Sequence, residues 1–146
     1  MIRSVLVVCI GNICRSPMAE ALLRRAVVDL NISVASAGLG ALVGRPADPI
    51  ADELMREAGI DISAHRARQI DESMVQDHDL ILVMDEAQRE DLSGRFPRAR
   101  GKIHSLGRWG GFEVPDPYRA PRSAFTQALE LIERGVRDWH ERLGKL

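Results

Sequence analysis

The sequence predicts an α/β fold, in which a doubly wound sheet of about four parallel strands carries helices on both faces. Three observations favour this class. The 146 residues are a common length for one domain. No run rich in Ser, Gly or Pro divides them, and short apolar runs alternate with segments of helical periodicity. We therefore expect residues 1–146 to form a single domain.

The first third of the chain predicts a strand, a helix and a second strand. Ser4–Val8 is almost continuously apolar, as in parallel strands that are covered on both faces. Ser16 and Pro17 fit the N-cap and the first position of a helix. Ser33–Ala37 predicts the second strand. The helix between them places apolar residues on one face, namely Ala19, Leu22, Leu23, Ala26 and Leu30.

The middle of the chain begins with a glycine-containing loop over Leu39–Pro46. Asp48 and Pro49 then fit the N-cap and first position of a second helix, which Gly59 ends. Asp71–Val75 predicts a further short helix. The apolar face of the second helix is predicted to hold Ile50, Leu54 and Ala58.

Two more strands are predicted in the second half of the chain. Leu80–Met84 is the clearest internal strand, and Lys102–Ser105 is a weaker one. The helix between them begins at either Asp85 or Asp91 and ends before Pro97.

The last part of the chain predicts a long loop and one helix. Arg108–Arg122 contains glycines and three prolines, so it predicts a loop, in which Trp109 and Phe112 either pack the loop or contact a partner. In the final helix apolar residues recur at steps of three and four, namely Phe125, Ala128 or Leu129, Ile132, Val136, Trp139 and Leu143.

Composition excludes several classes of protein. A net charge of −1 gives no basic excess for nucleic acid. No apolar run approaches the ~20 residues that span a bilayer, and the N-terminus lacks the pattern of a signal peptide. We therefore expect a cytoplasmic protein. Both cysteines, Cys9 and Cys14, lie in one loop, and the scattered histidines lack metal-ligand spacing, so we predict no metal and no cofactor.

The segment between Cys9 and Arg15 carries the strongest chemical signal. It follows the first strand, at the edge of the sheet where doubly wound folds bind ligands. Gly11 allows positive φ, and Asn12 tolerates it. The loop can therefore direct successive N–H groups at one oxyanion, which the helix N-terminus and the Arg15 guanidinium also favour.

The same donors favour the ionised form of the Cys9 thiol, and Ser16 can donate a hydrogen bond to its sulfur. Cys9 is then a nucleophile directed at the bound anion. A cysteine that ends a buried strand is more often inert, and the Cys-x5-Arg spacing alone is weak. The preceding strand, Gly11-Asn12 and the directly following Ser16-Pro17 favour the catalytic interpretation.

Residues 9–17 resemble the phosphate-binding loop of the low-molecular-weight protein tyrosine phosphatases. Asp116-Pro117-Tyr118 resembles the general-acid loop of that family. Ser36-Ala37-Gly38, residues 79–85 and the final helix also fit, so the resemblance covers essentially the whole chain.

The resemblance implies a role for each matching residue. Cys9 would attack phosphorus and form a phosphocysteine, while Arg15 and the amides of residues 10–15 hold the phosphate oxygens. Asp116 would protonate the leaving phenolate and then activate water. Besides Cys9 and Arg15, the loop residues with implied roles are Ile10, Gly11, Asn12, Ile13, Cys14 and Ser16; Asn12 would hold the loop shape, and Ser16 would help the thiolate leave.

Other assignments remained open for the acid and for the pocket walls. Asp116 read alone is a turn residue before proline, and Asp85 and Asp48 are rival acids, with Asp48 better interpreted as an N-cap. Tyr118 would stack on the substrate ring, and Leu42 is the candidate for the opposite wall. Arg119 replaces the second tyrosine of many eukaryotic members, as in bacterial members. It is either solvated or a contact for an acidic substrate segment.

Cys14 is either a small apolar loop residue or, as the resemblance implies, the partner of Cys9 in a reversible protective disulfide. A thiol-dependent arsenate reductase of similar fold is the alternative enzyme, but it needs cysteines beyond Cys14 and this chain has none. A phosphate carrier has no use for Asp116. The resemblance to bacterial members paired with exopolysaccharide tyrosine kinases implies a phosphotyrosine protein substrate, an autophosphorylated tyrosine kinase.

Overall fold

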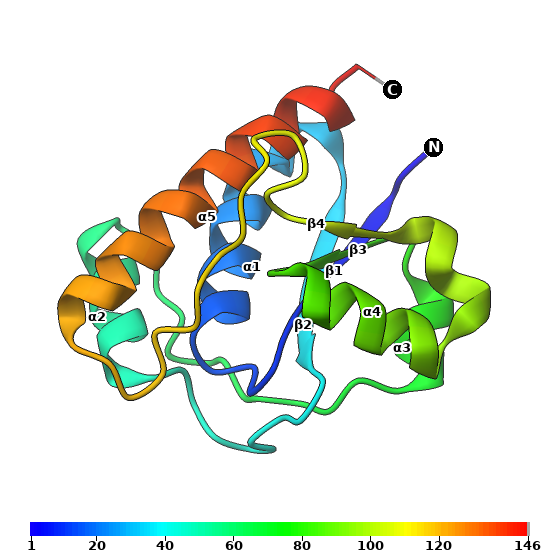
Figure 1. The fold of residues 1–146 in the computed structure, drawn as a ribbon. Coiled ribbons are helices and arrows are strands. Elements are labelled where there is room, and N and C mark those ends of the chain that lie inside the picture. The colour runs from blue at the N-terminus through cyan, green and yellow to red at the C-terminus, as the bar shows by residue number, and fades with distance from the viewer. Residues whose placement is uncertain (146) are drawn as a thin grey trace.

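The computed structural model describes residues 1–145 and contains a sheet of four parallel strands in the order β2-β1-β3-β4. The strands are β1 (Ser4–Cys9), β2 (Ser33–Gly38), β3 (Leu80–Val83) and β4 (Ile103–Ser105). The chain passes from β1 to β2 on one side and returns to β3 on the other (Figure 1). The direction of winding therefore changes beside the carboxyl end of β1, where doubly wound sheets bind ligands.

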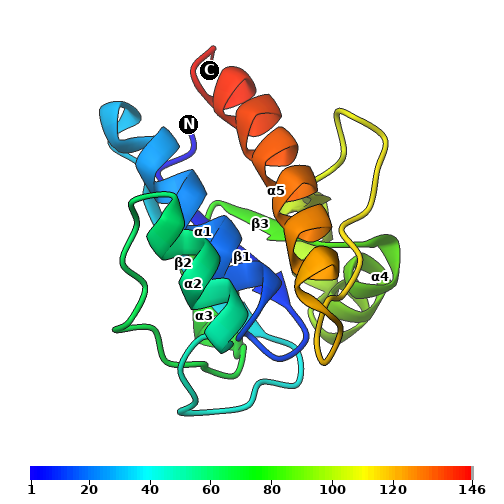
Figure 2. The same cartoon turned by 90° about the vertical axis from the view of Figure 1, so that its left-hand side faces the viewer.

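Helices cover both faces of the sheet, as the sequence predicts (Figures 1 and 2). One face carries α1 (Arg15–Ala26), α2 (Pro49–Glu57) and α5 (Arg122–Leu143). The other carries α3 (Glu72–Asp77) and α4 (Glu86–Arg95). Two short 3-10 helices complete the elements, η1 (Val28–Leu30) and η2 (Pro97–Lys102).

The central strand β1 explains the two-sided core. Val5 and Val7 point to the α1, α2 and α5 side, and Leu6 and Val8 to the α3 and α4 side. All four are fully buried, because alternate side chains of a strand point to opposite faces. A continuous apolar run is therefore the correct signal for this strand.

The capping signals locate three of the helices correctly. The Asp48 carboxylate accepts a hydrogen bond from the Ile50 amide, 2.9 Å away, at the start of α2, and Gly59 follows its end with a φ of +81°. Asp85 caps α4 by accepting from the Gln88 amide, which decides between Asp85 and Asp91. Asp71 caps α3 in the same way.

Three local predictions are wrong. Leu30 lies in η1 and not on the first helix, because α1 ends at Ala26. The first helix begins at Arg15, without a side-chain cap, so Ser16 lies inside its first turn, where its hydroxyl contacts Cys9. Ala58 is exposed, because α2 ends before it, and Met55 instead joins Ala51 and Leu54 on the buried face. The predicted strand boundaries differ from the observed ones by one residue at most.

The final helix and the loop before it agree with the sequence analysis. Its predicted apolar residues are all buried. Trp109 packs edge-on against Trp139, with 5.4 Å between the ring centroids. Phe112 packs against the core, and the Arg134 guanidinium lies over its ring, 4.7 Å from the centroid. These two aromatic residues therefore hold the loop against α5. Among residues 1–145, no helix is both long enough and apolar enough to cross a membrane.

Replacing Gly135 in α5 tests how closely this helix packs against Leu106, and Gly94 in α4 is the control glycine in an open position. A Cβ at Gly135 would lie 2.7 Å from Leu106 Cγ and 2.9 Å from its carbonyl oxygen, whereas a Cβ at Gly94 in α4 would meet nothing within 4 Å. We expect Gly135→Ala to lower the free energy of unfolding by about 1–3 kcal/mol through overpacking. Gly94→Ala should raise it by about 0.5–1 kcal/mol. Urea unfolding measures both, and equal stabilisation by the two would contradict the close packing of Leu106.

Candidate active site

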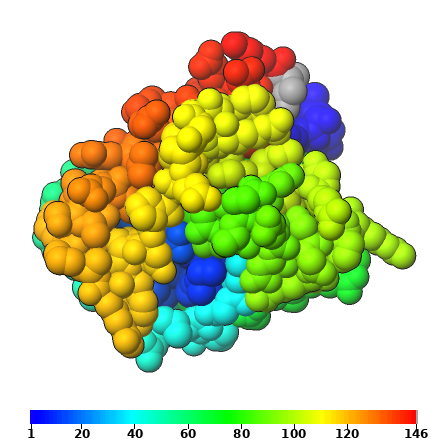
Figure 3. Space-filling view, viewed as in Figure 1, coloured from blue at the N-terminus to red at the C-terminus, as the bar shows by residue number. Residues whose placement is uncertain are grey.

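A small cavity of about 130 Å³ opens at the carboxyl end of β1. Figure 3 shows it as a hollow, where blue N-terminal atoms lie between orange-yellow, green and cyan parts of the chain. Its lining comes from three segments that are far apart in sequence: residues 9–15, the loop after β2, and the loop before α5. The lining residues are Cys9, Ile10, Gly11, Ile13, Cys14, Arg15, Gly40, Leu42, Asp116 and Tyr118.

The loop after β1 turns its carbonyl groups outward. The carbonyl oxygens of Cys9, Ile10 and Gly11 accept hydrogen bonds from the amides of Leu39, Gly40 and Leu42, at 2.9–3.0 Å. The Asn12 carbonyl lies 2.7 Å from His65 Nε2, and the Ile13 carbonyl accepts from the Asp48 amide at 2.8 Å. Every peptide unit in this stretch is therefore fixed from its carbonyl side.

The amides of the same loop are free. Within residues 1–145, no backbone N–H of residues 10–15 donates a hydrogen bond to another group of the protein. Buried backbone donors are rarely left without a partner. The six N–H groups, which have no acceptor in the protein, therefore form a cradle suited to an anion.

Asn12 holds the turn of the cradle. Its backbone has a φ of +59°, while Gly11 does not adopt positive φ, so the left-handed position expected at Gly11 belongs to Asn12. The Asn12 amide nitrogen donates to the hydroxyls of Ser16 (2.8 Å) and Ser36 (3.0 Å), and its oxygen accepts from the Arg68 amide (3.0 Å). The side chain is fully buried and uses its donors and its acceptor.

Cys9 lies at the floor of the cavity, almost completely buried. Its sulfur is 2.9 Å from the Ser16 hydroxyl oxygen. Because that oxygen already accepts a hydrogen bond from the Asn12 side-chain amide, the hydroxyl hydrogen of Ser16 is available to the sulfur. The arrangement stabilises a negatively charged sulfur by one hydrogen bond from a fixed donor.

Arg15 forms one side of the cavity and is only 2 % exposed. Its Nη1 donates to the Val114 carbonyl (2.9 Å) and lies 3.6 Å from the Asp85 carboxylate. Its Nε is buried and has no hydrogen-bond partner among the described residues. An orphaned donor on a buried guanidinium beside the amide cradle is a second sign that the site is built for an oxyanion.

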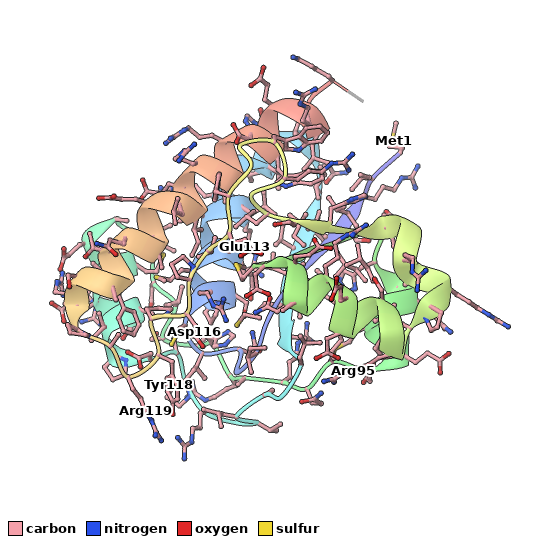
Figure 4. All side chains as sticks on the ribbon, in the orientation of Figure 1. Met1, Arg95, Glu113, Asp116, Tyr118 and Arg119 are labelled. Atoms are coloured by element: carbon pink, nitrogen blue, oxygen red, sulfur yellow. The ribbon has the colours of Figure 1, made fainter. Side chains whose placement is uncertain are left out.

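Asp116 and Tyr118 reach the cavity from the long loop before α5 (Figure 4). Asp116 Oδ2 lies 3.6 Å from Arg15 Nη2, and its Oδ1 accepts from the Tyr118 amide at 3.1 Å. The Asp116 side chain is about half exposed. The Tyr118 ring, 37 % exposed, forms part of the wall. The structure therefore brings Asp116 to the site, while Asp48 and Asp85 are helix caps.

The loop after β2 supplies the facing wall. Leu42 lines the cavity and is tied to the cradle by its own amide, which donates to the Gly11 carbonyl. Ile10 and Ile13 add apolar surface. The predicted wall residue Leu42 is therefore in place, and the cavity above the anion cradle is largely apolar.

Cys14 is buried, and the structure records Cys9 and Cys14 as free thiols. Burial, and then the Asp48 carboxylate and the Cys9 sulfur, raise the pKa of the Cys14 thiol far above its usual range. Cys14 therefore remains protonated under conditions in which an exposed thiol would ionise.

Sequence reasoning missed several groups that hold the site. His65 lacks metal-ligand spacing in the sequence, yet its ring contacts the Asn12 carbonyl. Ser36 and Arg68 bind the Asn12 side chain. Val114, in the loop that carries Asp116, accepts a hydrogen bond from Arg15 through its carbonyl, and its amide donates to the Met84 carbonyl at 2.9 Å. Only Ser36 could have been found from the sequence, because it lies in the Ser36-Ala37-Gly38 segment that fits the family. The contacts of His65, Arg68 and Val114 join residues that are far apart in the sequence.

Substitutions of Asn12 separate its backbone role from its side-chain role. Asn12→Gly keeps the left-handed backbone but removes three hydrogen bonds, whereas Asn12→Ala also forces a β-carbon into positive φ. We expect both to weaken binding of inorganic phosphate at least tenfold, and Asn12→Ala to be less stable than Asn12→Gly by about 1 kcal/mol. Competitive inhibition and urea unfolding measure the two effects. Phosphate binding equal to that of the unmodified protein would show that Asn12 does not shape the cradle.

Comparison with known proteins agrees with this geometry. The family model described as low molecular weight phosphotyrosine protein phosphatase matches residues 4–146. A probable low molecular weight protein-tyrosine-phosphatase, EpsP of Ralstonia nicotianae, is 53 % identical over 146 residues, 100 % of this chain and 99 % of the relative. The structure of Vibrio vulnificus Wzb in complex with benzylphosphonate is similar with a TM-score of 0.93 at 39 % identity, over 97 % of this chain and 99 % of that one.

The arginine phosphatase YwlE of Geobacillus stearothermophilus has the same fold, with a TM-score of 0.92 at 29 % identity, over 98 % of this chain and 94 % of that one. With its cradle, buried arginine and full-length match, the chain belongs to the low molecular weight phosphotyrosine protein phosphatase family.

Proposed function

We propose that the protein hydrolyses phosphotyrosine in proteins through a phosphocysteine on Cys9, without a metal ion or cofactor. The observation that carries the proposal is that the free amides of residues 10–15 and the orphaned Arg15 Nε belong to the loop that lines the cavity around the Cys9 sulfur. These donors match the oxygens of one phosphate and compensate the charge that develops on them in the transition state.

In the first step the Cys9 sulfur attacks phosphorus, so that a sulfur–phosphorus bond forms as the bond to the tyrosine oxygen breaks. Asp116, protonated, gives its proton to the departing phenolate oxygen. Its position on a half-exposed loop, near Arg15 and opposite the floor of the cavity, suits a group that meets the leaving oxygen. Asp85 points to the same guanidinium but caps α4, so it is assigned to hold Arg15.

In the second step water attacks the phosphocysteine, and Asp116, now ionised, accepts a proton from it. The sulfur–phosphorus bond breaks, inorganic phosphate forms, and the Ser16 hydroxyl stabilises the leaving sulfur from 2.9 Å. The amide cradle binds the phosphate oxygens in both steps, which is why one site serves both.

The walls of the cavity support an aryl phosphate as substrate. Leu42, Ile13 and Tyr118 offer apolar and aromatic surface to a phenyl ring above the cradle. Asp116 is the one carboxylate among the lining residues, whereas a phosphorylated guanidinium would need acidic groups around its nitrogens. The Wzb structure with benzylphosphonate, which carries a phenyl ring, supports the same choice.

We further propose that the protein substrate is an autophosphorylated bacterial tyrosine kinase that acts in exopolysaccharide assembly. The support is the resemblance to bacterial members of the family and the 53 % identity to EpsP. The kinase is a proposal from relatives and not from the cavity itself.

The activity is tested with two peptides of one sequence, carrying either phosphotyrosine or phosphoarginine, in the presence of a metal chelator. We expect rapid release of phosphate from the phosphotyrosine peptide, little from the other, and no turnover by Cys9→Ser. Cys14→Ser is the matched control and should retain turnover. Chelator-sensitive activity, faster hydrolysis of phosphoarginine, or an active Cys9→Ser variant would contradict the proposal.

The role of Asp116 is tested by its dependence on the leaving group. Asp116→Ala should slow hydrolysis of phenyl phosphate about a hundredfold or more, because the phenolate leaves without a proton. Esters of acidic phenols need little protonation, so the first step should be affected much less for them. Single-turnover rates across a series of substituted phenyl phosphates measure this. A uniform loss across the series would assign Asp116 to loop structure instead, and Asp85→Asn is the comparison for loss of an Arg15 contact alone.

We also propose that Cys14 protects Cys9 after oxidation. Peroxide would convert the Cys9 thiolate to a sulfenic acid, and the Cys14 thiol would condense with it, releasing water and forming a disulfide. Cys14→Ala should then lose activity irreversibly under peroxide, while the unmodified protein recovers most of its activity with dithiothreitol. Equal recovery of the two proteins would exclude the protective role.

A further inference from the structure

Arg119 follows Tyr118, which lines the cavity, and has an unusual backbone conformation. Its φ is +63°, the left-handed region that side chains with a β-carbon rarely adopt. The Ala120 amide donates to the Pro117 carbonyl at 2.8 Å, so Arg119 occupies the third position of a tight turn. A positive φ at that position ordinarily selects glycine or asparagine. An arginine at this position lowers the conformational stability of the turn relative to glycine.

The side chain of Arg119 lies against the Tyr118 ring. Its Cζ lies 5.1 Å from the centroid of the Tyr118 ring, within the range of a cation–π contact. Tyr118 is the wall residue that the substrate ring would meet. Figure 4 shows Arg119 beyond Tyr118, directed away from the body of the molecule. The guanidinium is therefore held beside the entrance rather than inside it.

The charge of Arg119 is not used inside the protein. Within residues 1–145, no carboxylate lies within 4.0 Å of its guanidinium. Its neighbour Asp116 is committed to Arg15 and to the Tyr118 amide. By contrast Arg122, three residues later, pairs with Glu53 and Glu57 at 2.6 Å. The exposed Arg119 therefore keeps its donors free for an outside anion.

We propose that Arg119 is a subsite for an anionic side chain that flanks the phosphotyrosine of the substrate. The inference rests on the proposed function, because it places the substrate ring against Tyr118. The recognised chemistry is an oxyanion whose two oxygens can pair with the guanidinium, either the carboxylate of Asp or Glu or the phosphate of a second phosphotyrosine. The rarely adopted backbone conformation of Arg119 is a second feature that marks this position as a functional one.

The test compares two matched variants. Arg119→Gln and Arg134→Gln each replace an exposed arginine that stacks on an aromatic ring, but Arg134 lies over Phe112, on α5. The substrates are phosphotyrosine peptides with alanine on both sides, the same peptides with one glutamate at each flanking position in turn, and one with a second phosphotyrosine. The quantity measured is the ratio of kcat/KM for each anionic peptide to that for the alanine peptide.

We expect at least one anionic peptide to be preferred about three- to fivefold by the unmodified protein, a size typical of an exposed charge pair. The preference should fall to about one in Arg119→Gln, persist in Arg134→Gln, reverse in Arg119→Glu, and weaken at high salt. Comparison of the glutamate and second-phosphotyrosine peptides identifies which anion is bound.

An unmodified protein with no anionic preference, or a preference that Arg119→Gln retains, would overturn the subsite. Arg119→Gly, which suits positive φ, shows that any loss is not a failure to fold, since its melting temperature should stay close to that of the unmodified protein. If no phosphotyrosine peptide is hydrolysed at all, the proposed function fails, and this result is distinct from hydrolysis without discrimination between flanking residues.

Discussion

The site depends on one constraint, the outward fixation of every carbonyl in the loop after β1. The loop after β2, the Asp48 amide and the His65 ring provide partners on the outer side, so the peptide planes cannot rotate. The N–H groups of residues 10–15 then have no protein partner, and in a trans peptide each faces away from the carbonyl that is bound on the outer side. Asn12 completes the constraint, because three buried hydrogen bonds of its side chain stabilise its left-handed backbone.

A second set of contacts connects this cradle to the acid loop. The Val114 backbone accepts from Arg15 and donates to the carbonyl of Met84, directly after β3. The Glu113 carboxylate accepts from the Glu86 amide at the start of α4, and Figure 4 shows it beside that helix. The loop that carries Asp116 is thus fixed to the edge of the sheet just before the acid, while Asp116 itself remains about half exposed. A fixed loop with a solvent-accessible carboxylate suits a group that must give and take protons.

The sequence predicts most of the fold because its elements depend on local signals. Continuous apolar runs predict the buried parallel strands. The helix starts predicted at Asp48, Asp71 and Asp85 are confirmed, because each carboxylate accepts a hydrogen bond from a backbone amide two or three residues later. The start of α1 was predicted wrongly for a physical reason. Ser16 has the chemistry of an N-cap, but its hydroxyl is used by Cys9 and Asn12, and the free amides ahead of it face the cavity. The contacts of His65, Arg68 and Val114 join segments 50–100 residues apart, so no local pattern encodes them.

The amide cradle is tested most directly by an NMR titration of the unmodified protein with inorganic phosphate. If the N–H groups of residues 10–15 receive the anion, their proton resonances move downfield together, with one affinity, because each gains a charged hydrogen bond. The Arg15 Nε resonance should move with them, since that donor is orphaned in the free site. Saturable phosphate binding that leaves these amide resonances in place, or shifts confined to surface arginines, would contradict the cradle and the mechanism built on it.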